Sequence, residues 1–172
     1  MRSELFQPTV EGEARLLLLI AAFSSGDDTL EGRTKMAKLD FFLRYPVYFN
    51  QAMKIRGISD ERQLDTEAIE DIETGMIRYR YGPWDPSYFA ILGRLIGKGL
   101  VTAVALDRGI GYKATDKGRE IAECLSKEPE WQEIPRKLKL LKRHLDLTGT
   151  SLKKFIYNNF PEITKAQWGE SI

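Results

Sequence analysis

The stretch "GRLIGKG", Gly93 to Gly99, comes closest to a known chemical motif, because spaced glycines followed by a lysine can form a phosphate-binding loop. That loop needs four residues between its first glycine and its Gly-Lys pair, and a serine or threonine after the lysine. Here three residues separate Gly93 from Gly97, and a glycine follows Lys98. We therefore assign these glycines to the end of a helix and the turn after it.

Carboxylates, histidine and cysteine provide no stronger candidate for catalysis. The pairs Asp27–Asp28 and Glu70–Asp71 have no neighbouring histidine and no apolar surroundings in sequence that would shift their pKa. The single histidine, His144, and the single cysteine, Cys124, are too few for a structural zinc site or an internal disulfide. The sequence predicts no catalytic residue, no metal site and no cofactor, and hence a protein that is not an enzyme.

The composition is that of one folded domain, or of a small domain with an appendage. Of the 172 residues, 42% are hydrophobic and 30% are charged, which is typical of a soluble globular protein. The longest apolar run, residues 14–23, is shorter than the roughly 20 residues of a membrane span. Glu11 and Glu13 precede it, where a signal peptide carries positive charge. We expect a cytoplasmic protein with no membrane partner.

Charge is unevenly distributed, although the net charge is only +1. Residues 59–75 contain seven acidic side chains and one arginine, which predicts an acidic insert around residues 57–75. Residues 132–154 contain seven lysines and arginines against two acidic residues. Such asymmetry fits either a charged partner or ordinary solvated helix faces.

Apolar spacing predicts a mostly helical chain. The expected helices cover about residues 11–25, 33–44, 46–56, 86–98 and 134–145, and a last helix capped by Thr150 or Ser151 and ended by Pro161. In "MIRYRY", residues 76–81, side chains alternate with a period of two, which indicates an extended strand. In helix 86–98, Phe89 is expected to face inward, and Tyr88, Arg94 and Lys98 outward.

The pattern from Gly99 to Leu125 is the most diagnostic of fold. Strands at residues 100–106 and 110–114 flank a glycine-containing turn and predict a β-hairpin, after which Thr115 caps a helix. Helices followed by a hairpin and a closing helix are the order of a winged helix-turn-helix. The predicted fold class is mostly α with a small β-hairpin, with a winged-helix domain at residues 1–127 and C-terminal amphipathic helices at 128–172.

A winged helix can bind DNA through its reading helix and its wing, and cationic side chains are the candidates for phosphate contacts. These candidates are Arg94, Lys98, Arg108, Lys113, Lys139, Lys142 and Arg143. The nearly neutral net charge and the acidic insert favour a protein partner over direct DNA binding.

Aromatic residues and arginines near the predicted connections are the candidates for a protein interface, because these residue types are enriched at interface hot spots. The candidates are Arg78, Arg80, Trp84, Tyr88, Trp131, Phe155 and Tyr157. The alternative for many of the aromatics is that they pack the short connections of the domain.

Four phrases carry a resemblance to a known family: "KLDFFLRYP" from Lys38, "YRYGPWDPSYFAILGRLIGKGLV" from Tyr79, "YKATDKGREIA" from Tyr112 and "LKKFIYNNFPEI" from Leu152. With them the chain resembles the middle component of bacterial ABC-three-component systems, a family that includes the middle subunit of the Lamassu anti-phage and anti-plasmid systems. The resemblance spans the chain from the second helix to near its end.

The resemblance implies a small non-catalytic subunit beside an SMC/Rad50-like ATPase and an effector, often a nuclease. Such a subunit joins the ATPase assembly, which senses foreign DNA, and helps to hold the effector inactive. The family offers no catalytic residues to carry over. The main alternative is a winged-helix DNA-binding transcription regulator, and a weaker one is an adaptor that restrains a toxic partner.

Overall fold

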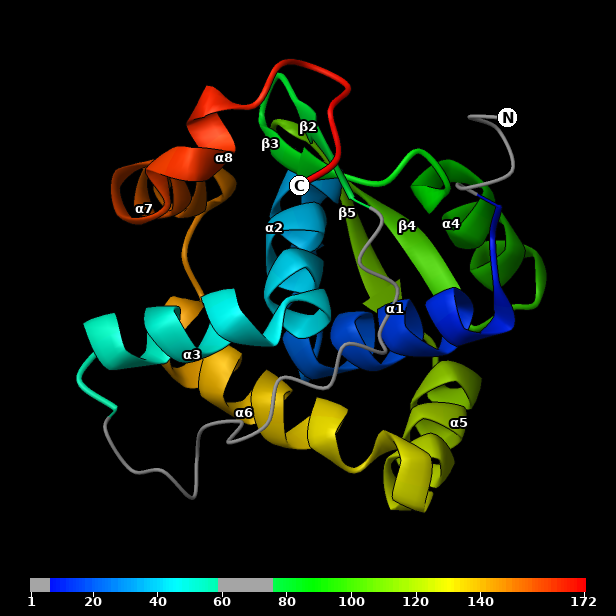
Figure 1. The fold of residues 1–172 in the computed structure, drawn as a ribbon. Helices are drawn as coiled ribbons and strands as arrows, with labels where there is room; N and C mark the ends of the chain where they lie inside the picture. The colour runs from blue at the N-terminus through cyan, green and yellow to red at the C-terminus, as the bar shows by residue number, and fades with distance from the viewer. Residues whose placement is uncertain (1–6, 59–75) are drawn as a thin grey trace.

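The computed structural model describes residues 7–58 and 76–172, and in this part of the chain the fold is mostly helical with a small antiparallel sheet (Figure 1). The helices are α1 Val10–Phe23, α2 Gly32–Arg44, α3 Pro46–Ile55, α4 Tyr88–Gly97, α5 Asp116–Lys127, α6 Glu133–Leu145, α7 Gly149–Asn159 and α8 Pro161–Lys165, with a 3₁₀ turn η1 at Pro129–Trp131. The strands are β1 Leu30–Glu31, β2 Ile77–Tyr79, β3 Gly82–Trp84, β4 Val101–Leu106 and β5 Gly109–Ala114.

The larger sheet has the order β1-β5-β4, with every neighbouring pair antiparallel. Leu106 pairs with Gly109 at the tight turn between β4 and β5. Gly109 has a φ of 100°, a left-handed conformation that glycine adopts without the steric cost of a Cβ atom. Leu30 of β1 pairs with Tyr112 of β5, so the segment before α2 is fastened to the hairpin.

A second hairpin, β2–β3, lies at the top of the molecule in Figure 1, beside the C-terminal end of the chain. Ile77 pairs with Trp84 across this hairpin. Three backbone hydrogen bonds join Met76 and Arg78 to residues 169–172, including one of 2.8 Å from Arg78 N to the Glu170 carbonyl. The C-terminal tail therefore covers one edge of the hairpin.

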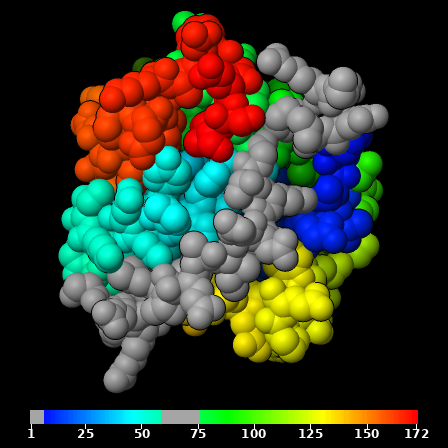
Figure 2. Space-filling view, in the orientation of Figure 1, coloured from blue at the N-terminus to red at the C-terminus, as the bar shows by residue number. Residues whose placement is uncertain are grey.

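A single hydrophobic core contains side chains from both ends of the chain. Leu16 and Ile20 of α1 are fully buried, because α1 packs against α2, α4, α5, α6 and β5. Leu141 of α6 and Ile156 of α7 belong to the same core, since α6 packs on α1 and α7 on α2. Figure 2 shows the orange and red C-terminal segments directly adjoining the cyan surface of α2 and α3. The predicted parts 1–127 and 128–172 thus share one core, and their division into two domains stays a prediction.

The expected helices and the β4–β5 hairpin are present, with bounds that differ by a few residues. One detail was wrong. Thr148, not Thr150 or Ser151, caps α7, and its hydroxyl accepts a hydrogen bond from Ser151 N at 3.2 Å. Helix α7 ends at Asn159, before Pro161, but Pro161 also begins the short helix α8, which was not predicted. Apart from Gly57 and Ile58, the predicted acidic insert lies outside the described residues.

Candidate functional site

A buried network of charged groups joins α1, α2 and the segment before α4. Arg15 Nε donates to Asp40 Oδ1 at 2.6 Å, and the Tyr88 hydroxyl donates to Asp40 Oδ2 at 2.7 Å. Arg44 Nη1 donates to Asp85 Oδ2 at 2.7 Å. Burial raises the pKa of Asp40, but the charges of Arg15 and Arg44 outweigh it and hold the pKa below its usual value. The network is closed to solvent and fixes α4 on α1 and α2.

This network reverses two expectations for α4. Tyr88 was predicted to point outward to a partner, but it is fully buried because its hydroxyl reaches Asp40. Phe89 was predicted to point inward, but it is 57% exposed. The inward stripe of α4 is therefore rotated relative to the prediction. Tyr88 cannot contribute to an exposed interface, whereas Phe89 can.

Two of the predicted phosphate contacts, Arg94 and Lys98, are paired with one acidic residue, Glu13 of α1. Arg94 Nη1 lies 3.2 Å from Glu13 Oε1, and Lys98 Nζ donates to Glu13 Oε2. Burial raises the pKa of Glu13, but the hydrogen bonds from Lys98 and Arg94 outweigh it and lower the pKa. Both cations are about half exposed, so they are partly neutralised before any phosphate approaches.

The two predicted cations of the β4–β5 hairpin differ in their surroundings. Arg108 lies at the turn, is exposed and forms no ion pair with any described residue. Lys113 is half-buried, and its Nζ donates to the Gly26 carbonyl at 2.7 Å. Arg108 is therefore the more accessible of the two.

The remaining predicted cations lie along a groove between α1, α5 and α6, with a volume of about 520 Å³, which we name the basic groove. Its apolar lining is Leu18, Ala21, Ala22, Ala122, Pro135 and Leu138. Arg119, Lys139, Lys142 and Arg143 line it as well, with Glu123 and Ser126. Lys142 pairs with Asp28 and Asp146, whereas Lys139 and Arg143 are exposed and form no ion pair with the described residues.

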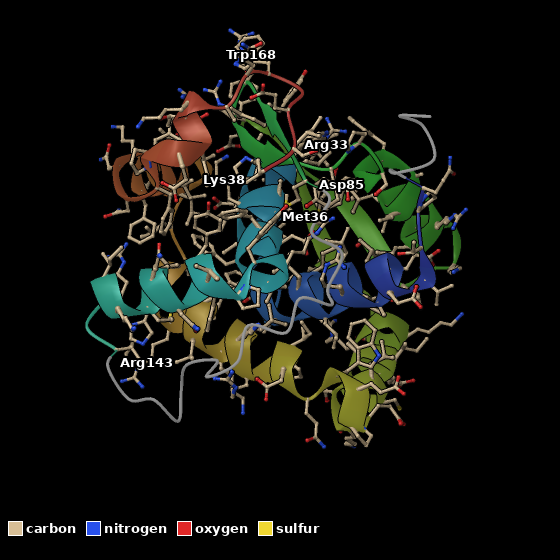
Figure 3. The ribbon with its side chains drawn as sticks, viewed as in Figure 1. Arg33, Met36, Lys38, Asp85, Arg143 and Trp168 are labelled. Atoms are coloured by element: carbon tan, nitrogen blue, oxygen red, sulfur yellow. The ribbon has the colours of Figure 1, made fainter. Side chains whose placement is uncertain are left out.

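A second groove, of about 650 Å³, lies between the β2–β3 hairpin, the starts of α2 and α4 and the turn of the β4–β5 hairpin. We name it the aromatic groove. It is lined by Gly32, Arg33, Thr34, Ile77, Tyr79, Tyr81, Trp84, Pro86, Phe89, Gly109, Ile110 and Tyr112. Tyr79, Tyr81 and Phe89 are 48%, 45% and 57% exposed. In Figure 3, Arg33 of this groove and Arg143 of the basic groove are well separated.

The structure divides the predicted interface residues among several places. Trp84 is half-buried in the aromatic groove, and the exposed Arg80 guanidinium lies 5.4 Å from the centre of the Tyr81 ring. Arg78 donates to the Ala166 carbonyl at 3.0 Å, so it holds the C-terminal tail. The other three, Trp131, Phe155 and Tyr157, are partly buried against the core.

Sequence reasoning missed most of the aromatic groove. The alternation in residues 76–81 placed Tyr79 and Tyr81 on one face of a strand. Strand β2 ends at Tyr79 and Tyr81 lies in the turn before β3, but both line the groove. Arg33 and Ile110 come from distant segments, and their position beside the hairpin depends on tertiary packing that no local pattern contains.

Within residues 7–58 and 76–172, no group of three or more histidine, cysteine, aspartate or glutamate side chains could hold a metal ion. None of the helices in the described part of the chain combines the length and the apolar character needed to cross a membrane. Comparison with known protein families, curated proteins and solved structures finds no match in any of the three.

Proposed function

We propose that this chain is a non-catalytic bridging subunit of a bacterial defence complex, joining an SMC/Rad50-like ATPase to an effector. The resemblance to middle components of ABC-three-component systems supplies these partner classes. The observation that carries the proposal is the exposed basic groove, because an apolar floor with basic side chains beside it suits an amphipathic helix of a protein partner. It shares no lining residue with the aromatic groove, so a partner bound there leaves the aromatic groove for a second ligand.

We further propose a winged helix-turn-helix core for this subunit. The strand order β1-β5-β4 supports it, because the strand before the helix pair joins the outer edge of the wing hairpin. In this interpretation α2 and α4 are the helix pair, and the β4–β5 hairpin is the wing. The segment from α3 to β3 is then an insertion between the two helices.

The basic groove is the better surface for the ATPase. Three alanines line it, so the backbone of a partner helix can approach closely, and an amphipathic helix can place apolar side chains on this floor. Lys139 and Arg143, four residues apart on α6, would attract an acidic border on that helix. Four cations against one acid, Glu123, also disfavour basic partners.

The test is co-expression with a coiled-coil ATPase encoded beside the gene for this chain, followed by size-exclusion chromatography at low and physiological salt. Wild-type protein is expected to co-elute with the ATPase. Lys139→Glu combined with Arg143→Glu should weaken the complex by ten-fold or more, because it reverses both unpaired charges. The matched control, Lys54→Glu with Lys154→Glu, reverses two exposed lysines outside the basic groove. Separate elution of the wild-type proteins at both salt concentrations would contradict the proposal.

The second candidate is a winged-helix transcription regulator, which the same order of helices and strands favours. Its reading helix would be α4, whose Arg94 and Lys98 are already paired with Glu13. A gel shift of the purified chain on its own promoter fragment tests this candidate. Arg94→Glu with Lys98→Glu should abolish the shift, and a shift that survives both changes rules out α4 as the DNA-contacting helix.

A further inference from the structure

We infer that the aromatic groove is a binding site for single-stranded nucleic acid, which holds unpaired bases against its exposed rings. Binding there does not depend on the partner contact proposed for the basic groove, because the two grooves share no lining residue.

Aromatic rings are the first property that fits unpaired bases. Tyr79, Tyr81 and Phe89 each expose about half of their surface, although large apolar side chains are usually buried. The Trp84 ring centre lies 6.0 Å from that of Tyr79 and 5.9 Å from that of Phe89, so these three rings form one cluster, and Tyr81 lines the same groove. Bases stack on such rings with little dependence on sequence, because every base has a π face.

Cations beside these rings are the second property. The Arg33 guanidinium lies 4.4 Å from the centre of the Phe89 ring, and that of Arg80 lies 5.4 Å from the centre of Tyr81. A guanidinium can bind a phosphate with two hydrogen bonds or stack on a base. Neither arginine forms an ion pair with any described residue. Phe89 and Tyr81 therefore each have beside them a guanidinium with no carboxylate partner among the described residues.

The charge around the aromatic groove is the third property that fits a nucleic acid. None of the lining residues is acidic. The border also has the exposed Arg108, which adjoins the lining residue Gly109. The acids nearest in sequence are the exposed Glu31 and Asp107, and Asp85, which is buried and paired with Arg44. The border is thus net positive, in contrast to the reading surface of α4, where Glu13 pairs with both cations. A phosphate backbone is the charged partner that this border matches.

The bases of an intact duplex cannot stack on the rings of the aromatic groove. In a duplex the base faces are covered by neighbouring bases, and only base edges and phosphates are presented to a protein. The aromatic groove provides stacking surfaces, which require base faces that are already exposed. Its volume of about 650 Å³ falls within the roughly 300–1,000 Å³ of ligand sites. We therefore expect a preference for single strands over duplex.

Fluorescence anisotropy with the full chain tests the inference. The probes are labelled oligonucleotides of about 20 nucleotides: oligo-dT, oligo-U and the dT·dA duplex. At least one single strand should bind about ten-fold more tightly than the duplex. Tyr81→Ala and Phe89→Ala should each weaken single-strand binding by about ten-fold, the loss expected for one stacked base. Tyr81→Trp and Phe89→Trp should keep it, and the comparison of oligo-dT with oligo-U identifies DNA or RNA as the ligand.

Matched charge reversals locate the site. Arg80→Glu should weaken single-strand binding, whereas Lys54→Glu, a charge reversal on α3 outside both grooves, should leave it within about two-fold. These residues are exposed, so all variants should fold, which circular dichroism checks. Equal affinity for duplex and single strand, or binding that is unaffected by both alanine changes, would overturn the inference. A third result would also overturn it: the chain binds none of the probes, and backbone amides of the aromatic groove are protected from hydrogen exchange in the complex with the ATPase. The groove would then be a protein interface.

Discussion

Lys38 of α2 is a buried ammonium group that has no carboxylate partner among the described residues. It is 2% exposed, and its Nζ donates to the Thr34 carbonyl at 3.1 Å. Burial lowers the pKa of Lys38 from 10.5 to about 8, and the positive charge of Lys153 adds to this effect. The folded chain therefore holds this proton less tightly than the unfolded chain does.

This difference predicts how stability depends on pH. Between pH 8 and about 10.5 the unfolded chain keeps the proton on Lys38 and the folded chain loses it, so the free energy of unfolding should rise with pH. Lys38→Met removes the buried charge and should raise the free energy of unfolding at pH 7 by about 2–3 kcal/mol, with no such rise above pH 8. Urea unfolding at pH 7 and 9.5 measures both effects.

Exposed Lys54 supplies the control for this change. Lys54→Met should leave both the stability and its pH dependence close to those of the wild type, because its ammonium stays in water in both states. Parallel pH profiles for wild type and Lys38→Met would contradict the assignment of a lowered pKa to Lys38.

Single residues were also where sequence reasoning was least accurate. Leu92 and Leu95 of α4 are buried, as their helical spacing indicates. The predicted orientations of Tyr88 and Phe89 were the reverse of those observed. The contact that buries Tyr88 is the hydrogen bond from its hydroxyl to Asp40, which is 48 residues away in sequence. Buried charges such as Arg15 and Asp40 depend on partners that only the folded chain brings together.

At the scale of elements, the segment from Tyr112 to Gly118 joins the β4–β5 hairpin to α5. The Thr115 hydroxyl accepts from Gly118 N at 2.9 Å, which caps α5, and it donates to the Gly99 carbonyl at 2.7 Å. A Cβ atom on Gly118 would lie 2.0 Å from the Leu100 carbonyl oxygen. Gly118 therefore allows α5 to pack directly against the start of the hairpin.

Replacing Gly118 with alanine sets two effects on stability against each other: the steric clash with Leu100 and the gain in helix propensity. Alanine favours a helix by about 1 kcal/mol relative to glycine, yet at this position it must push α5 away from Leu100. We expect Gly118→Ala to lower the free energy of unfolding by about 1–3 kcal/mol, the typical cost of overpacking. Thermal unfolding followed by circular dichroism measures this loss.

Gly93 of α4 is the matched control, because a Cβ atom added there meets nothing within 4 Å. Gly93→Ala should be neutral or stabilising by up to about 1 kcal/mol. If both alanine variants were equally stabilised, the close contact at Gly118 would be without energetic consequence.

Elements with a strong periodic pattern were predicted, and short ones were not. The β4–β5 hairpin and the amphipathic helices follow from residue spacing and capping residues within a few positions. Strand β1 has two residues and was not predicted, because so short a segment has no alternation to detect. It is stabilised by pairing with β5, a contact between segments about 80 residues apart.

At the scale of the whole molecule, the C-terminal helices complete the core. Phe160 is fully buried, with its ring centre 6.2 Å from that of Phe42 in α2 and 5.1 Å from that of Tyr48 in α3. The basic groove likewise takes five of its twelve lining residues from α6. Loss of the C-terminal part would therefore disturb both the stability of the fold and the surface proposed to bind a partner.

One shared core predicts one unfolding transition. Phe160→Ala removes a buried ring and should lower the free energy of unfolding by about 3–5 kcal/mol, whereas Phe89→Ala, the same change at an exposed position, should cost less than about 1 kcal/mol. Tryptophan fluorescence and far-ultraviolet circular dichroism should report coincident urea transitions for the wild type, because α6 and α7 cannot leave α1 and α2 without opening the core. An earlier, separate transition of the C-terminal helices would instead mean that residues 128–172 form a unit of their own.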